Sequence, residues 1–130
     1  MSRSDSILLV DGDHTVRQRC RELLESVGYT VFESPGATHA QMFLRTITPA
    51  SVLIEVDLPD GRGSELLRSI RGNPATRQLP VLLMSASDAP PDASDLAAGV
   101  LQKPFSPEQL VAAVRFACGM PPPASAAAPS

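Results

Sequence analysis

The 130-residue sequence lacks any cluster of basic residues and any apolar run of membrane-spanning length. Its 11 lysine and arginine residues are outnumbered by 14 acidic residues, which gives a formal net charge of -3. A chain without a basic patch has no electrostatic means of attracting nucleic acid or anionic lipid. Apolar runs such as residues 7–10 and 81–84 are far shorter than the roughly 20 residues that cross a bilayer. We therefore expect a cytoplasmic protein that binds neither nucleic acid nor membrane.

Cysteine and histidine are also scarce, with two of each. Cys20 and Cys118 fall on the apolar faces of expected helices, so we predict two reduced core thiols and no disulfide framework. His14 and His39 have no cysteine or acidic residue at metal-ligand spacing, which favours solvated positions on helices. Neither residue type indicates a metal site.

Short apolar segments alternate with segments of helical periodicity along most of the chain. Residues 14–27 carry apolar side chains at helical spacing up to Gly28, and Ser106-Pro107 with Gln109 has the pattern of a helix start. Further helices are expected at 37–46, with Ile47 facing inward, and around 66–70, whereas 85–99 leaves room only for a short one at 92–98. Strands are expected at residues 7–10, 29–33, 51–56, 81–84 and 100–102.

This alternation predicts an α/β fold: an open, doubly wound parallel sheet with helices on both faces. In such sheets the functional groups gather where the strands end at their carboxyl edge. The residues at those ends are Asp11, Asp13, Glu55, Ser85 and Lys103. The sequence thus predicts one crevice that holds carboxylates, a hydroxyl and an amine. We expect residues 1–120 to form this domain and 121–130, rich in Pro, Ala and Ser, to be a disordered tail or linker.

One interpretation of the crevice is a phosphatase. The segment "DGDHT" at 11–15 fits the pattern of the haloacid dehalogenase superfamily, in which the first aspartate attacks phosphate, the second is the acid/base and Mg²⁺ neutralises charge. Two features oppose it. The helix begins directly after Asp13, which leaves no room for a flap, and Glu108 is the only acid beyond Lys103.

A second interpretation covers nearly the whole chain. The segments "LLVDGD", "VLIEVDLPDGRG", "LPVLLMSAS" and "KPF" occur in the order that resembles the receiver domain of bacterial response regulators. The resemblance implies a flavodoxin-like (βα)5 fold with strand order 2-1-3-4-5, here with a shortened fourth helix. It also implies a phosphoacceptor aspartate, an acidic pair for Mg²⁺, a switch hydroxyl at Ser85, a lysine at Lys103 and an aromatic switch residue.

The sequence departs from this family pattern at three of those positions. The acceptor lies four residues before the loop proline, Pro59, and that position holds Glu55. The second residue of the acidic pair Asp11-Gly12 is a glycine, so one Mg²⁺ carboxylate is missing and Asp11 and Asp13 are only weak candidates for metal ligands. Val100 occupies the aromatic switch position.

These departures predict a pseudo-receiver of a bacterial two-component signalling system that is not an enzyme. We expect Glu55 and Lys103 to pair directly, little or no Mg²⁺ binding, no cofactor, and phosphorylation-independent contact with a protein such as a signalling kinase, scaffold or effector module. Glu55 carries one negative charge against nearly two for phosphate, so we do not expect it to imitate a phosphoaspartate. A functional phosphoacceptor receiver, with Asp57 as the nearby substitute acceptor, is the alternative. The sequence leaves open whether two copies form a homodimer.

Overall fold

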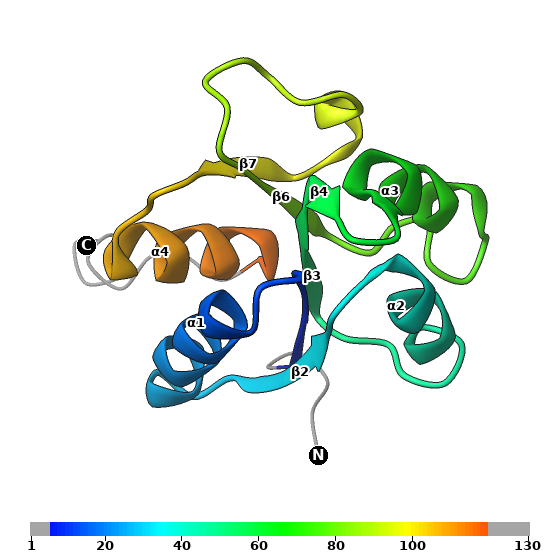
Figure 1. Cartoon of the computed structure of the whole chain (residues 1–130). Coiled ribbons are helices and arrows are strands. Elements are labelled where there is room, and N and C mark those ends of the chain that lie inside the picture. The colour runs from blue at the N-terminus through cyan, green and yellow to red at the C-terminus, as the bar shows by residue number, and fades with distance from the viewer. Residues whose placement is uncertain (1–5, 120–130) are drawn as a thin grey trace.

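A five-stranded parallel sheet forms the centre of the molecule (Figure 1). The computed structural model describes residues 6–119, so the predicted tail at 121–130 lies outside the described residues. The strand order is β2-β1-β3-β6-β7, which is the predicted order 2-1-3-4-5 when the strands of this sheet are counted along the chain. The strands are β1 (Ser6–Val10), β2 (Thr30–Ser34), β3 (Ser51–Glu55), β6 (Val81–Ser85) and β7 (Gly99–Gln102).

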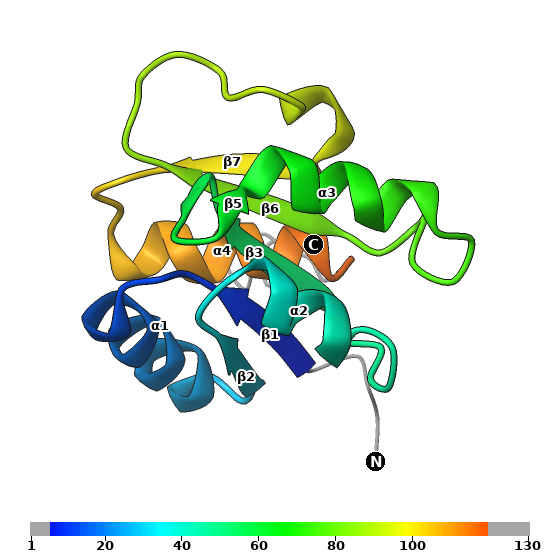
Figure 2. The same cartoon turned by 45° about the vertical axis from the view of Figure 1, so that its right-hand side comes forward.

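Helices cover both faces of this sheet. Figures 1 and 2 show α1 and α4 on one face and α2 and α3 on the other. The helices are α1 (His14–Ser26), α2 (Ala37–Phe43), α3 (Gly63–Gly72) and α4 (Pro107–Ala117). None of the helices between residues 6 and 119 has the length and apolar character needed to cross a membrane.

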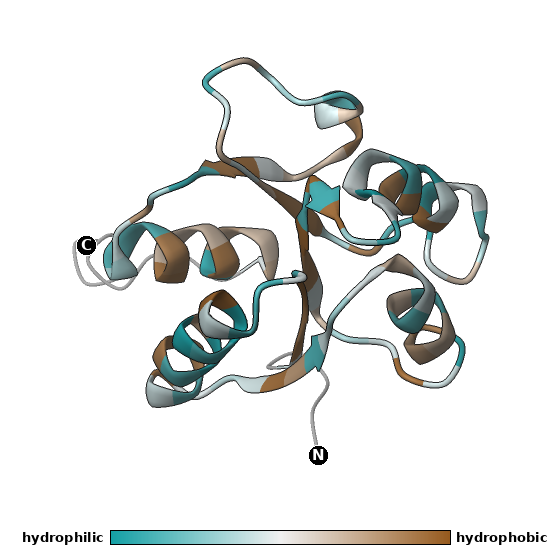
Figure 3. Cartoon of the chain, viewed as in Figure 1, coloured by the Kyte–Doolittle hydropathy of each residue, from teal (hydrophilic) through white to brown (hydrophobic). Residues whose placement is uncertain are grey.

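Burial on both faces explains why the central strands are continuous apolar runs. Every residue of β1, β3 and β6 is buried, and Figure 3 shows the hydrophobic colour concentrated along these strands. Alternate residues supply two separate clusters. On β1, Ile7 and Leu9 pack with Leu24 of α1, whereas Leu8 and Val10 belong to the cluster that contains Leu67 of α3. The sheet therefore separates two apolar layers, as expected for a doubly wound fold.

Cys20 and Cys118 are free thiols, as predicted. Cys20 is 2% exposed in the cluster around α1 and α4, and Cys118 packs against the same cluster. Their place in an apolar layer agrees with the role of small core side chains.

Three local features differ from the sequence prediction. Helix α2 ends at Phe43, three residues early, and Ile47 is 37% exposed, so the predicted inward position of Ile47 is wrong. The loop after β3 contains a two-stranded antiparallel pair, β4 (Asp57–Leu58) and β5 (Gly61–Arg62), which the sequence did not indicate. The expected short fourth helix is reduced to a single 3₁₀ turn at Ser94–Leu96.

Arg71 of α3 anchors the chain where that fourth helix is reduced. Its guanidinium donates hydrogen bonds to the carbonyl oxygens of Leu96 (3.0 Å), Leu79 (2.7 Å) and Arg77 (3.1 Å). One charged side chain thereby ties the 3₁₀ turn and the start of β6 to α3. Where the fourth helix is reduced, β7 is left open to solvent, because Val100 is 43% exposed.

Candidate functional site

The ends of β1, β3 and β7 bring three of the predicted site residues into contact. Lys103 follows β7, and its Nζ donates a hydrogen bond to Asp11 Oδ2 over 2.9 Å and a second one to Glu55 Oε1. Asp11 is 2% exposed and Glu55 is 7% exposed, so both carboxylates lie out of bulk solvent. We call Asp11, Glu55 and Lys103 the lysine triad.

The lysine triad contains one ammonium and two carboxylates, which leaves one excess negative charge. Burial disfavours the charged form of Lys103, but the hydrogen bonds and charges of Glu55 and Asp11 outweigh that effect and raise the pKa of Lys103 above its ordinary value. The ammonium is therefore held in its charged form at neutral pH.

Backbone amides take up the remaining oxygens of both carboxylates. Asp11 Oδ1 accepts the N–H of Asp13 over 2.9 Å, and Glu55 Oε2 accepts the N–H of Asp57 over 3.2 Å. All four carboxylate oxygens consequently have a donor. These contacts fix the two side chains at the edge of the sheet.

Asp13 has a structural role in this arrangement. Its Oδ1 accepts the backbone N–H groups of Thr15 over 2.9 Å and of Val16 over 3.3 Å, which is the geometry of a helix N-cap. Asp13 therefore caps α1 and lies outside the lysine triad.

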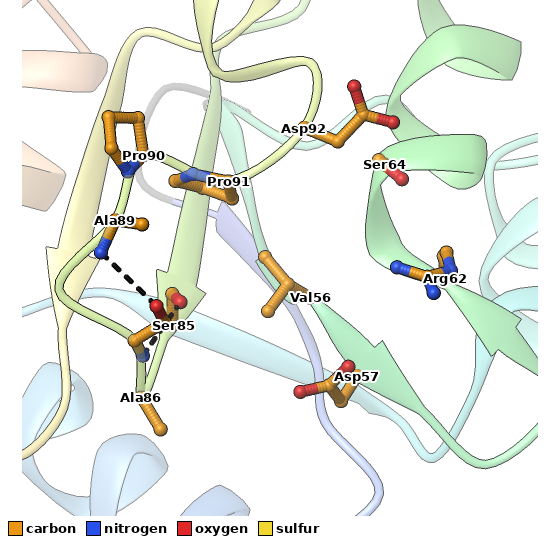
Figure 4. A pocket seen from close by; sticks show the side chains of 11 residues that line it. Val56, Asp57, Arg62, Ser64, Ser85, Ala86, Ala89, Pro90, Pro91 and Asp92 are labelled. Atoms are coloured by element: carbon orange, nitrogen blue, oxygen red, sulfur yellow. Dashed lines mark hydrogen bonds between the residues drawn. The ribbon is translucent and has the colours of Figure 1, made fainter.

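Ser85 lies at the end of β6, the strand between β3 and β7. Its Oγ accepts the N–H of Ser87 over 3.1 Å, and its side chain lines a cleft of about 440 Å³. Figure 4 shows Ser85 on one wall of this cleft, with Asp57 and Arg62 across from it. Within residues 6–119 the Ser85 hydroxyl makes no hydrogen bond to the lysine triad, but the backbone carbonyl oxygen of Ser85 accepts the N–H of Lys103 over 2.7 Å.

Gly12, the residue after Asp11, is packed closely against Pro59. A Cβ at this position would lie 2.8 Å from Cδ of Pro59 and 3.1 Å from its Cγ. The rigid pyrrolidine ring therefore occupies the space in which a longer side chain at position 12 would begin.

Comparison with known proteins identifies the family. The sequence profile of the response regulator receiver domain matches residues 7–115. The chain belongs to the response regulator receiver family. It is 32% identical over 116 residues to the KDP operon transcriptional regulatory protein KdpE of Escherichia coli K12, covering 86% of this chain and 50% of KdpE. The receiver thus spans about half the length of that relative.

Solved receiver structures have the same fold. A putative response regulator from Chloroflexus aurantiacus superposes with a TM-score of 0.82 at 28% identity, covering 88% of this chain and 98% of that one. The chemotaxis response regulator CheY4 of Vibrio cholerae gives a TM-score of 0.82 at 23% identity, covering 86% and 97%. The receiver fold predicted from the sequence is confirmed, and the phosphatase interpretation is set aside in favour of this family.

Magnesium is the ion that the family resemblance implies, and the residues of this receiver do not fit it as they stand. Mg²⁺ requires several oxygen ligands in near-octahedral geometry. Here both oxygens of Asp11 have donors, Gly12 offers no carboxylate, and Asp13 is occupied as a helix cap. No group of three or more His, Cys, Asp or Glu side chains within residues 6–119 is arranged to hold a metal ion.

The sequence predicted the contact between Glu55 and Lys103, but it did not predict that Asp11 also accepts a hydrogen bond from Lys103. Asp11 and Lys103 are 92 residues apart, and only the order of the strands makes them neighbours. One signal was available: the ends of adjacent parallel strands meet, and β1 lies next to β3. An acid at each of those ends faces one lysine, so a shared contact follows from the charges.

Proposed function

We propose that this chain is a pseudo-receiver: a receiver that works through protein contacts and not through a phosphoryl group on its own acceptor position. The observation that carries the proposal is the lysine triad, in which Lys103 binds Glu55 and Asp11 directly. In this family the equivalent lysine grips a phosphoryl group. Here its ammonium is already satisfied by two carboxylates.

The substitution of Glu55 for aspartate supports the proposal on grounds of geometry. Phosphoryl transfer needs the attacking oxygen in line with the leaving group, and an added methylene moves that oxygen out of position. Glu55 Oε1 and Oε2 are also both engaged, with Lys103 and with the N–H of Asp57. A carboxylate held by two donors is a weaker nucleophile than a free one.

Loss of the second acid at Gly12 supports it independently. Transfer to a carboxylate brings together groups of like charge, which a cation has to neutralise. The site has no carboxylate at position 12, and Pro59 fills the space beside Gly12 that the side chain of an acidic residue would need. We expect the receiver to signal in the cytoplasm through a protein partner such as a kinase, a scaffold or an effector module.

Intact-mass spectrometry tests the proposal directly. The full chain is incubated with acetyl phosphate and Mg²⁺, beside a receiver known to accept phosphate from this donor. We expect the reference receiver to gain the mass of a phosphoryl group and this chain to keep its mass. A gain in mass that is lost in Asp57→Asn would establish the functional receiver with a substitute acceptor, and the proposal would be wrong.

Magnesium binding provides a second measurement. Amide NMR spectra are recorded while Mg²⁺ and then beryllium fluoride are added to the protein. We expect no saturable shifts at Glu55, Lys103 or their neighbours, because the oxygens of the triad are already bonded. Saturable shifts at these amides would contradict a metal-independent site.

A further inference from the structure

A second hollow lies between α1 and the segment that joins β7 to α4. Its volume is about 380 Å³, within the usual size range of small-molecule sites, and its lining is mainly apolar. It is separate from the cleft of Figure 4, with which it shares Ala86. The residues that line it include Val16, Arg19, Cys20, Ala86 and Phe105.

The buried side of this hollow is uncharged. Cys20 is 2% exposed, and burial raises the pKa of its thiol to about 11, so the thiol is neutral at physiological pH. Val16 and Phe105 are partly buried against the same core cluster as Cys20. A ligand body that contacts these groups must therefore be apolar.

Arg19 supplies the charge that is free to bind a ligand. Its side chain is exposed and makes no hydrogen bond or ion pair with any of residues 6–119, whereas Arg17 and Arg21 on the same helix are both paired with Glu33. Lys103 also lines the hollow, but its ammonium is bound in the lysine triad. The planar guanidinium of an arginine suits a carboxylate, which it binds through two parallel hydrogen bonds.

We propose that this hollow binds a small apolar molecule that carries one carboxylate. The apolar body packs against Cys20, Val16 and Phe105, and the carboxylate pairs with Arg19. A volume near the lower end of the usual range suits one ring with a short chain. The excess negative charge of the lysine triad next to the hollow disfavours a second carboxylate. The site does not depend on whether the chain is a pseudo-receiver.

Amide NMR titration of the full chain with 4-phenylbutyrate tests this site. We expect saturable shifts at Cys20, Ala86 and Phe105. The uncharged analogue 4-phenyl-1-butanol should shift the same amides with an affinity about five-fold lower, the size expected for one exposed ion pair. If 4-phenylbutyrate gives no saturable shift, or shifts a different set of amides, the proposal is overturned. A hollow that admits only the side chains of a protein partner would give that negative result.

Two variants separate the charge from the cavity. Arg19→Gln should remove the preference for the carboxylate over the alcohol, and Arg45→Gln, at another exposed arginine whose side chain is unpaired among residues 6–119, should keep it. Ala86→Leu fills the hollow and should weaken both compounds about ten-fold, while a well-dispersed spectrum shows that the variant is folded. A preference that survives Arg19→Gln, or an affinity unchanged in Ala86→Leu, would overturn the proposal.

Discussion

Lys103 is the residue on which the charge balance of the site depends. Its side chain is 22% exposed, and those of Asp11 and Glu55 are 3% and 10% exposed, so its removal would leave two neighbouring carboxylates without a cation. We expect Lys103→Met to lower the free energy of unfolding by about 1–3 kcal/mol at neutral pH, less than for a fully buried pair because water screens the lysine. Urea denaturation measures this change.

A double variant serves as the control for Lys103. Adding Glu55→Gln to Lys103→Met removes one of the two unpaired charges and should recover part of the lost stability. If the double variant is as unstable as the sum of the two single variants, the triad does not act as a coupled unit.

Gly12 provides a steric test at the scale of one atom. A Cβ at position 12 would lie 2.8 Å from Pro59 Cδ, whereas a Cβ at Gly72 would meet nothing within 4 Å. Gly12→Ala should therefore destabilise the protein by about 1–3 kcal/mol. Gly72→Ala, in the last turn of α3, should stabilise it by up to about 1 kcal/mol. Equal urea midpoints for the two variants would show that Pro59 moves aside freely.

At the scale of elements, Asp60, in the turn between β4 and β5, caps the N-terminus of α2. Its Oδ1 and Oδ2 accept the backbone N–H groups of Ala37 (2.8 Å) and Thr38 (3.0 Å), and these bonds lower the pKa of Asp60 below its ordinary value. A lowered pKa in the folded state means that the carboxylate stabilises the fold fully above the unfolded pKa of about 3.9. That contribution is lost as the pH falls through the folded pKa.

The stability difference between wild type and Asp60→Asn should consequently be largest near neutral pH and shrink below about pH 4. Urea midpoints at several pH values measure it. Asp95→Asn is the matched control, because Asp95 is exposed and its side chain makes no hydrogen bond within residues 6–119. A difference that does not depend on pH would mean that the charge of Asp60 has no part in starting α2.

Arg71 and Arg68 lie on the same helix and have different roles. Arg71 is partly buried and donates to three carbonyl groups, and burial lowers its pKa, whereas Arg68 forms an exposed bidentate pair with Asp92. We expect Arg71→Met to cost about 2–4 kcal/mol, because three carbonyl groups lose their donor, and Arg68→Met to cost less than about 1 kcal/mol. Similar urea midpoints for the two variants would contradict the anchoring role of Arg71.

The same pair of residues shows where sequence reasoning succeeds and where it stops. The strands of the main sheet could be predicted, because burial on both faces produces apolar runs. The spacing of apolar residues on α3 distinguishes its buried face from its polar face, but it does not indicate that Arg71 is partly buried while Arg68 is exposed. The groups that Arg71 binds are the backbone carbonyl oxygens of residues 77, 79 and 96. Every residue has a backbone carbonyl group, so the sequence does not indicate which of them will accept a hydrogen bond from Arg71.

The candidate site could also be predicted only in part from the sequence. Strand ends predicted that Glu55 and Lys103 would meet, since their positions follow from the order of elements. Other features depend on distances that only the folded chain provides. The approach of Pro59 to Gly12 is such a feature, because it joins segments far apart in sequence. The contact of Asp11 with Lys103 is different, since the predicted strand order already placed Asp11 beside Glu55.

At the scale of the whole molecule, the sheet couples two apolar layers. Leu9 and Leu8 are adjacent on β1, yet they belong to clusters on opposite faces. If a strand shifts because it has lost its contacts on one face, its side chains on the other face shift with it and lose their contacts too. The receiver should therefore unfold as one cooperative unit, as single domains of this size generally do.

Matched truncations on the two faces test this coupling. Leu24 of α1 and Leu67 of α3 are both 0% exposed and lie in different clusters. We expect Leu24→Ala and Leu67→Ala each to cost about 2–5 kcal/mol, from lost burial and from the cavity left behind. Urea unfolding followed by circular dichroism and by the NMR signals of each layer should give coincident transitions, with lowered midpoints and an unchanged slope. If Leu24→Ala melts the α1 layer while the α3 layer stays folded, the sheet does not transmit the loss and the two layers are separate units.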